Sequence, residues 1–115
     1  MLMPIGTYNV IKETVNTGLG VGVKLHYGRE KTFHFRAAMN SGAGTAVFQA
    51  YGSNVVSPSA SNVGDWVPIG SPITLSLNGT TTVSDGFEDF GPWLWINVSM
   101  VSITAGGQGE AWVAA

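Results

Sequence analysis

The sequence predicts an all-β fold: a β-sandwich of about eight or nine antiparallel strands, with jelly-roll topology favoured. Apolar and polar residues alternate over several short runs, which is the pattern of a strand with one buried face. Turns rich in glycine and proline separate these runs, and no segment shows a clear helical period. Periodicity does not by itself separate a jelly roll from an immunoglobulin-like sandwich, so both topologies stay open.

The alternating runs cover residues 21–27, 33–39 and 73–77. In the middle run, Phe33, Phe35 and Ala37 fall on one face, and His34 and Arg36 fall on the other. Turn clusters lie at residues 27–30, 40–44, 77–80 and 105–109. Asn78-Gly79 is the strongest hairpin signal, because a type I′ turn needs positive φ at both central residues.

The longest predicted strand covers residues 93–104. Leu94, Ile96, Val98 and Met100 share one face, and the later apolar residues change parity, which predicts a β-bulge near Met100-Val101. Residues 110–115 read as a strand. An apolar chain end that contains Trp112 and Val113 is expected to be paired into a sheet.

The first twenty residues leave two readings open. Residues 8–15 favour a strand over a short helix, because β-branched residues are frequent there. Residues 1–20 form either an N-terminal arm that orders on docking or an ordinary first strand. Residues 53–65 are expected to form a polar surface loop, and residues 1–115 to form one β-sandwich domain.

Composition excludes several functional classes. The 115 residues include no cysteine, which removes disulfides, thiolate nucleophiles and cysteine-ligated zinc. No stretch approaches the roughly 20 apolar residues of a membrane helix, so we expect no membrane partner. Residues 1–6 lack the basic start and apolar run of a secretion signal, which favours synthesis in a cytoplasm.

The charged residues are few and unevenly placed. Only 10% of residues are charged, and all five basic residues lie within the first 36 positions. Nucleic-acid binding needs a stripe of basic side chains on the protein, and five basic residues are too few to form one. We therefore expect no nucleic-acid partner. Opposite patches would favour head-to-tail contact between identical subunits. Alternatively, folding mixes the two signs over the surface.

Two clusters of side chains are candidate metal sites. His26 and His34 could approach Glu30 and form a two-histidine, one-carboxylate site, but two solvated histidines are the favoured reading. The acidic cluster gives three further candidate ligands. These are Asp85, Glu88 and Asp89.

The acidic cluster could hold calcium or supply the two acids of a glycosidase, but its spacing matches no EF-hand loop. The favoured reading is a solvated loop whose Phe87 and Phe90 tuck under the sheet. Residues 18–22 lack the lysine and helix of a phosphate loop, and no Gly-x-Ser-x-Gly elbow occurs. We therefore expect no enzyme activity, no metal and no cofactor.

Tryptophan gives the best candidates for a contact surface. Four tryptophans occur, and most should be core, but Trp95 shares its parity with the polar residues Asn97 and Ser99. The edge of the second sheet, a neighbouring subunit or a stacked sugar ring could cover this face, and burial against a protein surface is favoured. The candidate interface residues combine aromatic and basic side chains. They are Trp95, Trp66, Tyr8, Lys12, Arg29 and Lys31.

The second half of the chain has a recognisable order of turns and strands. The segments that carry it are Ala46–Asn54, Asp65–Gly70, Ile73–Leu75, Val83–Phe87 and Pro92–Val98, followed by a glycine-rich hairpin. Over about residues 33–115, this order resembles small β-sandwich virion proteins of tailed bacteriophages, especially jelly-roll head decoration (cement) proteins.

The resemblance implies a structural role. A decoration protein binds the major capsid protein over the joints of the lattice and stabilises the shell, commonly as a dimer or trimer. The expected location is the capsid surface of a virion assembled in a bacterial cytoplasm. The alternative is a carbohydrate-binding module, with Trp95 or Trp66 as its platform, or another small component of a phage tail, fibre or neck.

Overall fold

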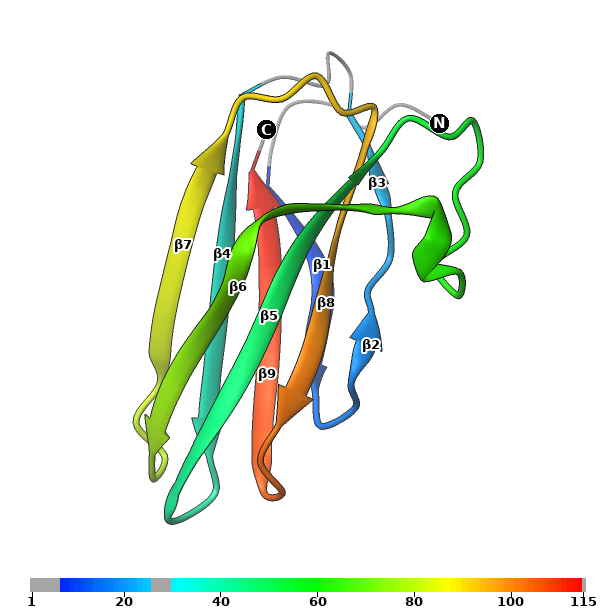
Figure 1. Ribbon diagram of the computed structural model, residues 1–115. Coiled ribbons are helices and arrows are strands. Elements are labelled where there is room, and N and C mark those ends of the chain that lie inside the picture. The colour runs from blue at the N-terminus through cyan, green and yellow to red at the C-terminus, as the bar shows by residue number, and fades with distance from the viewer. Residues whose placement is uncertain (1–6, 26–29, 115) are drawn as a thin grey trace.

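Two antiparallel β-sheets pack face to face in the computed structural model, which describes residues 7–25 and 30–114 (Figure 1). The first sheet has the order β1-β9-β4-β7. Its strands are β1 (Thr7–Thr14), β9 (Gly107–Ala114), β4 (Lys31–Met39) and β7 (Val83–Asp89). The second sheet has the order β2-β8-β5-β6, with β3 also paired to β8. Its strands are β2 (Gly18–Leu19), β3 (Val23–Lys24), β8 (Trp95–Ile103), β5 (Ala43–Ser53) and β6 (Val67–Asn78).

The connections identify the topology as a jelly roll. Strands β4 and β5, β6 and β7, and β8 and β9 are consecutive in the chain but lie in opposite sheets. The sheet β1-β9-β4-β7 therefore packs over the sheet β2-β8-β5-β6. Each strand stands at the same place in its sheet as a strand next to it in the chain. Folding a chain of paired strands across two sheets in this way is the jelly-roll arrangement. The predicted β-sandwich and its favoured topology are confirmed.

The hairpin predicted at Asn78-Gly79 is wrong. Strands β6 and β7 belong to different sheets, and no residue other than glycine has a positive φ in the described ranges. Of the two residues Asn78 and Gly79, only Gly79 has a positive φ, at +62°, so the turn is not type I′. Its N–H donates to the Gly42 carbonyl at 2.8 Å, and its carbonyl accepts from the Met39 N–H at 3.0 Å. The turn therefore packs on the β4–β5 connection.

Strand β4 supplies the clearest core pattern. Its odd-numbered residues from Lys31 to Met39 are buried, and four of its other residues lie on the outer face. Phe35 stacks on Phe48 of β5 with ring centroids 5.3 Å apart, and Phe33 stacks on Phe87 of β7 at 5.1 Å. Phe87 therefore tucks under the sheet as predicted. Phe90 does not, because its side chain is 64% exposed.

Strand β8 contains the predicted bulge. Phe48 pairs with Met100 and Val47 pairs with Ser102, which leaves Val101 as the extra residue. The strand begins at Trp95, so Leu94 lies outside it and is 44% exposed, contrary to the face predicted for it. Asn97 is fully buried rather than exposed, because the Gly20 carbonyl accepts a 2.9 Å hydrogen bond from its Nδ2.

The N-terminal part of the chain agrees with the sequence in most places. Residues 7–14 form an ordinary edge strand paired with β9, and residues 1–6 lie outside the described residues. The run predicted over 21–27 is shorter than expected: β3 covers Val23–Lys24, Val21 is 64% exposed, and residues 26 and 27 are not described. The C-terminal strand is confirmed, since β9 lies between β1 and β4 with Val113 fully buried.

The loop between β5 and β6 lies at the surface as predicted. It contains one short 3-10 helix, η1 (Val63–Asp65), whose residues Val63 and Gly64 are exposed. Ser53 fixes the base of the loop, because its hydroxyl donates to the Asp65 carbonyl at 2.7 Å. In the described parts of the chain, no helix is long and apolar enough to cross a membrane.

Candidate functional site

Two of the six predicted interface residues lie inside the protein. Lys31 has no exposed side-chain surface, and its Nζ lies 2.9 Å from Asp89 Oδ2. Trp66 is 5% exposed, and its Nε1 donates to the Ser59 carbonyl at 2.9 Å. Both side chains are satisfied within the chain. The structure therefore corrects their assignment to a contact surface, and Trp66 offers no stacking platform.

The other four do not form one surface. Tyr8 packs against the core from β1, and Lys12 is exposed on the same edge strand. Trp95 is half-buried on the outer face of the second sheet. Within the described part of the molecule, its Nε1 is a buried donor with no acceptor. Arg29 lies outside the described residues.

The candidate metal ligands are not assembled. His26 lies outside the described residues, while His34 and Glu30 are exposed. Asp89 is paired with Lys31, whereas Asp85 and Glu88 are exposed on β7. Across residues 7–25 and 30–114, no group of three or more His, Asp or Glu side chains is close enough to hold a metal ion.

Oppositely charged residues pair across the fold. Arg36 Nη2 lies 2.6 Å from Glu110 Oε1, which joins positions 74 residues apart in the chain. The Lys31–Asp89 pair likewise joins the early basic half to the later acidic half. Folding therefore mixes the two signs at these positions, as the second of the two sequence readings expected.

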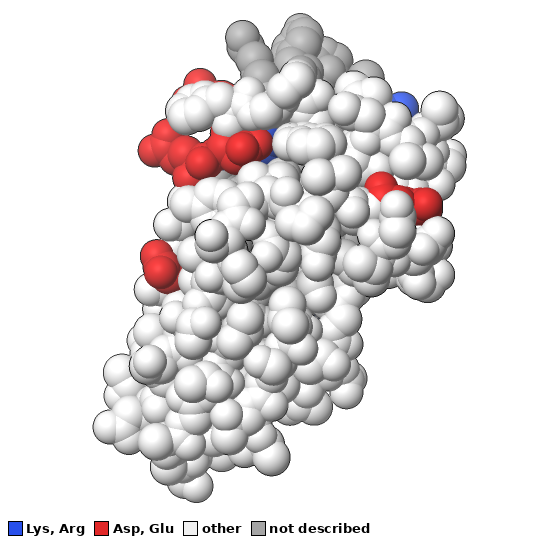
Figure 2. All heavy atoms as spheres, in the orientation of Figure 1, with Lys and Arg blue, Asp and Glu red and all other residues white. Residues whose placement is uncertain are grey.

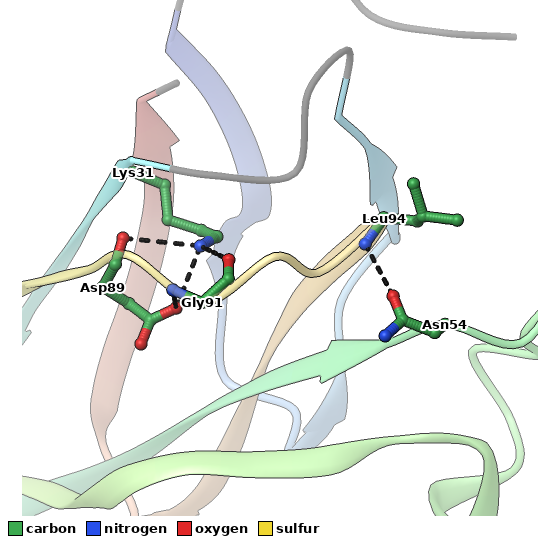
Figure 3. A network of polar contacts seen from close by, with 5 residues as sticks. All are labelled: Lys31, Asn54, Asp89, Gly91 and Leu94. Carbon is green, nitrogen blue, oxygen red and sulfur yellow. Dashed lines mark hydrogen bonds and ion pairs between the residues drawn. The ribbon is translucent and has the colours of Figure 1, made fainter.

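The segment that joins β7 to β8 is held at both ends (Figure 3). At one end, Lys31 Nζ donates to Asp89 Oδ2 at 2.9 Å and to the Gly91 carbonyl at 2.7 Å. Asp89 Oδ2 also accepts the Gly91 N–H at 3.0 Å. At the other end, the Leu94 N–H donates to Asn54 Oδ1 at 3.0 Å. These bonds fix the backbone that carries Phe90 and Leu94.

Exposed apolar side chains gather on this segment and on the neighbouring β5–β6 loop. Of the nine large apolar side chains exposed in the described residues, five belong to these two connections. We use the name apolar end for four of them. They are Val55, Val56, Phe90 and Leu94, with exposed fractions of 45, 86, 64 and 44%. Apolar side chains that are both exposed and held in place are typical of a contact surface.

Among the described residues, the exposed charged side chains beside Phe90 are acidic. Lys31 pairs in register with Asp89, and Thr32 pairs with Glu88, so the exposed Glu30 and Glu88 lie beside the segment that bears Phe90. Figure 2 shows most of the acidic side chains in view in the upper half of the molecule, with a few basic atoms there, while the lowest third of this face shows no charged side chain.

The outer face of the first sheet carries a cluster that the sequence analysis did not assign. Trp112 of β9 is half-buried, with the His34 ring centroid at 5.3 Å and the Arg36 Cζ at 4.8 Å from its rings. Alternation had placed His34 and Arg36 on one face. Trp112 reaches His34 and Arg36 because β9 pairs with β4. These two strands are far apart in the chain, so local alternation does not predict the cluster.

The sequence matches no family model and no curated protein. Three solved structures share the fold. The SPBc2 prophage-derived protein YomS is 17% identical with a TM-score of 0.53, and the match covers 94% of this chain and 89% of that chain. A cleaved adhesin domain of Lys-gingipain from Porphyromonas gingivalis is 7% identical with a TM-score of 0.53, and the match covers 95% of this chain and 73% of that chain.

A CBM4 structure is 15% identical with a TM-score of 0.50, and the match covers 77% of this chain and 53% of that chain. This chain therefore corresponds to about half of the CBM4 structure. At these identities the likenesses establish a shared β-sandwich fold. Function has to be argued from the surface, because one fold supports many functions.

Proposed function

We propose that this chain is a structural protein of a tailed-bacteriophage virion, a head decoration protein that binds the major capsid protein at the capsid surface. The observation that carries the proposal is the apolar end, where Phe90 and Leu94 are exposed on a segment fixed by hydrogen bonds at both ends. A surface that is ordered before binding loses less conformational entropy on association.

Two further observations support a phage origin and a binding role. The order of turns and strands resembles small phage virion proteins. The fold matches prophage-derived YomS over nearly the full length of both chains. The proposal includes a homo-oligomer, a dimer or trimer, and it assigns the chain no enzymatic activity and no nucleic-acid or membrane partner.

The surface also indicates what the partner must offer. The exposed side chains of the apolar end require an apolar counterpart, and the neighbouring Glu30 and Glu88 favour basic groups at its rim. We therefore propose a capsid site with an apolar centre and Lys or Arg at its border. Since the charge contribution is exposed, it is expected to weaken as salt concentration rises.

The proposal is tested by adding the protein to expanded phage heads assembled without it and measuring co-sedimentation. We expect binding at micromolar concentration and greater heat resistance of the shell. Val56→Ser, at the apolar end, should weaken binding about tenfold, since Val56 is 86% exposed in the free chain and burial of a valine side chain is worth about 1.5 kcal/mol or more.

Val101→Ser is the matched control. Val101 is also an exposed valine, but it lies at the far end of β8, roughly 20 Å along the strand from Trp95. It should bind heads as the unmodified protein does. Absence of binding to heads, binding to tails alone, or equal loss in both variants would each contradict the proposal.

A further inference from the structure

The outer face of the first sheet contains a groove that is separate from the apolar end and does not depend on the proposed function. Strand register places small residues in one row across the sheet, because Ala114 pairs with both Thr7 and Thr32. In the adjacent row on the same face, Trp112 pairs with His34, and His34 pairs with Gly86. We call these six residues the outer groove.

Small residues create both hollows: the row Thr7–Ala114–Thr32 lies beside the large Trp112, and Gly86 interrupts the row that contains Trp112 and His34. A hollow of about 350 Å³ lies beside Trp112 and is also lined by Thr7, Thr32 and Ala114. A second hollow of about 440 Å³ lies over Gly86, where the sheet lacks a side chain. Both hollows are lined by Thr32 and His34, so they adjoin, and each is at the small end of the volumes typical of ligand sites.

The aromatic wall of the first hollow is held in place by its neighbours. Arg36 lies over the Trp112 rings, and its guanidinium is itself bonded to Glu110 at 2.6 Å. His34 contacts the same indole at a tilt of 56°. These contacts restrict the indole before any ligand arrives, which lowers the entropy lost on binding.

The charges near the outer groove define the ligand class. Arg36 is the cation beside the first hollow, and Glu110 already neutralises it. Asp85 and Glu88 border the second hollow. Among the described residues that line the two hollows, Arg36 is the one cation, so a phosphate-rich or acidic ligand would meet these carboxylates without a second guanidinium or ammonium to bind it. A neutral ligand avoids this repulsion.

The remaining groups match a polyhydroxylated ring. An indole face packs against the C–H groups on one side of a pyranose, while the threonine hydroxyls and the imidazole donate to and accept from sugar hydroxyls. We propose that the outer groove binds a neutral saccharide, with one sugar ring beside Trp112 and the next ring over Gly86.

The test uses neutral oligosaccharides of glucose, galactose, mannose and N-acetylglucosamine, first on an array and then by calorimetric titration of the full chain. Binding of at least one of them is expected. Trp112→Ala removes the aromatic wall, and Ala114→Leu fills the first hollow while keeping the indole. Each should weaken binding about tenfold or more.

Gln108→Ala is the matched control, because Gln108 lies on the same outer face of β9 but two residues beyond Glu110. It should bind normally, and the melting temperatures of all variants establish that they fold. If Trp112→Ala fails to fold, Ala114→Leu decides the result. The proposal is overturned if no neutral oligosaccharide binds at millimolar concentration, if anionic or amine-bearing sugars bind better, or if neither groove variant weakens binding. A negative result for saccharide binding would not count against capsid binding, because the outer groove and the apolar end are separate surfaces.

Discussion

Lys31 carries its charge into the interior, where three oxygen atoms replace water around the ammonium group. These are the Asp89 carboxylate oxygen and the carbonyl oxygens of Asp89 and Gly91, at 2.9, 3.4 and 2.7 Å. Burying a charge is costly unless it is paired and hydrogen-bonded. The arrangement therefore joins the start of β4 firmly to the segment that carries Phe90.

Asp89→Ala should destabilise the protein by about 3 kcal/mol, because it leaves the buried ammonium without its counter-charge. The value is at the lower end of the usual range, since the Asp89 side chain is 22% exposed. Urea unfolding measures the change. Asp85→Ala, at an exposed position on the same strand, should stay within about 0.5 kcal/mol of the unmodified protein. Equal effects in the two variants would show that the ion pair contributes nothing.

Residue type alone does not settle which side chains become buried. In the sequence, Phe87 and Phe90 look alike, yet Phe87 stacks on Phe33 while Phe90 is 64% exposed. Phe90 lies three positions after Phe87, which is the opposite parity, and it follows the last residue of β7, so the strand does not direct its side chain toward the core. The burial of the Lys31 charge is not predictable from residue type either, because its partner Asp89 lies 58 residues away in the chain.

At the scale of single elements, the bulge in β8 is predictable and the turns are only partly so. Parity within residues 93–104 shows that an extra residue is needed near Val101. The Asn78-Gly79 signal correctly indicates a chain reversal with positive φ at Gly79. It does not indicate that β6 and β7 enter opposite sheets, because pairing depends on distant strands.

Deleting Val101 should be tolerated far better than deleting Ser99. Without Val101, Met100, Ser102 and Ile103 keep their partners on β5, because the register already skips that residue. Without Ser99, either Val98 or Met100 must leave the core, where both are fully buried. We expect the second deletion to cost at least about 2 kcal/mol more, as for other losses of a large core side chain.

Circular dichroism and urea unfolding of the two deletion variants measure this difference. The far-ultraviolet spectrum should retain its β character when Val101 is removed. If the two deletions are equally damaging, the bulge is a required part of the sheet rather than an insertion into it.

The candidate site shows the same limit as the turns. Alternation places His34 and Arg36 on one face and, in the C-terminal run, would place Glu110 with Trp112. Only the β4–β9 pairing brings the two sets together. The frequency of tryptophan at interfaces makes Trp66 a candidate platform, but its side chain is 5% exposed and its Nε1 bonds to Ser59 of the β5–β6 loop.

At the scale of the whole molecule, the sheet edges are protected against strand addition. Edge strand β6 contains Pro68 and Pro72 and a bulge at Gly70, which has φ +70°. Edge strand β7 carries the charged residues Asp85 and Glu88. Edge strand β1 has two register irregularities, and edge strand β2 is only two residues long. Such features block edge-to-edge pairing. Partners are therefore expected at loops and sheet faces.

The most direct measurement is electron cryomicroscopy of expanded heads incubated with the protein. The account predicts ordered extra density over the joints between capsid subunits, fitted by the sandwich with Phe90 and Leu94 against the shell. Heads that carry no added density, or a sandwich attached by the opposite end with these two side chains facing solvent, would contradict it.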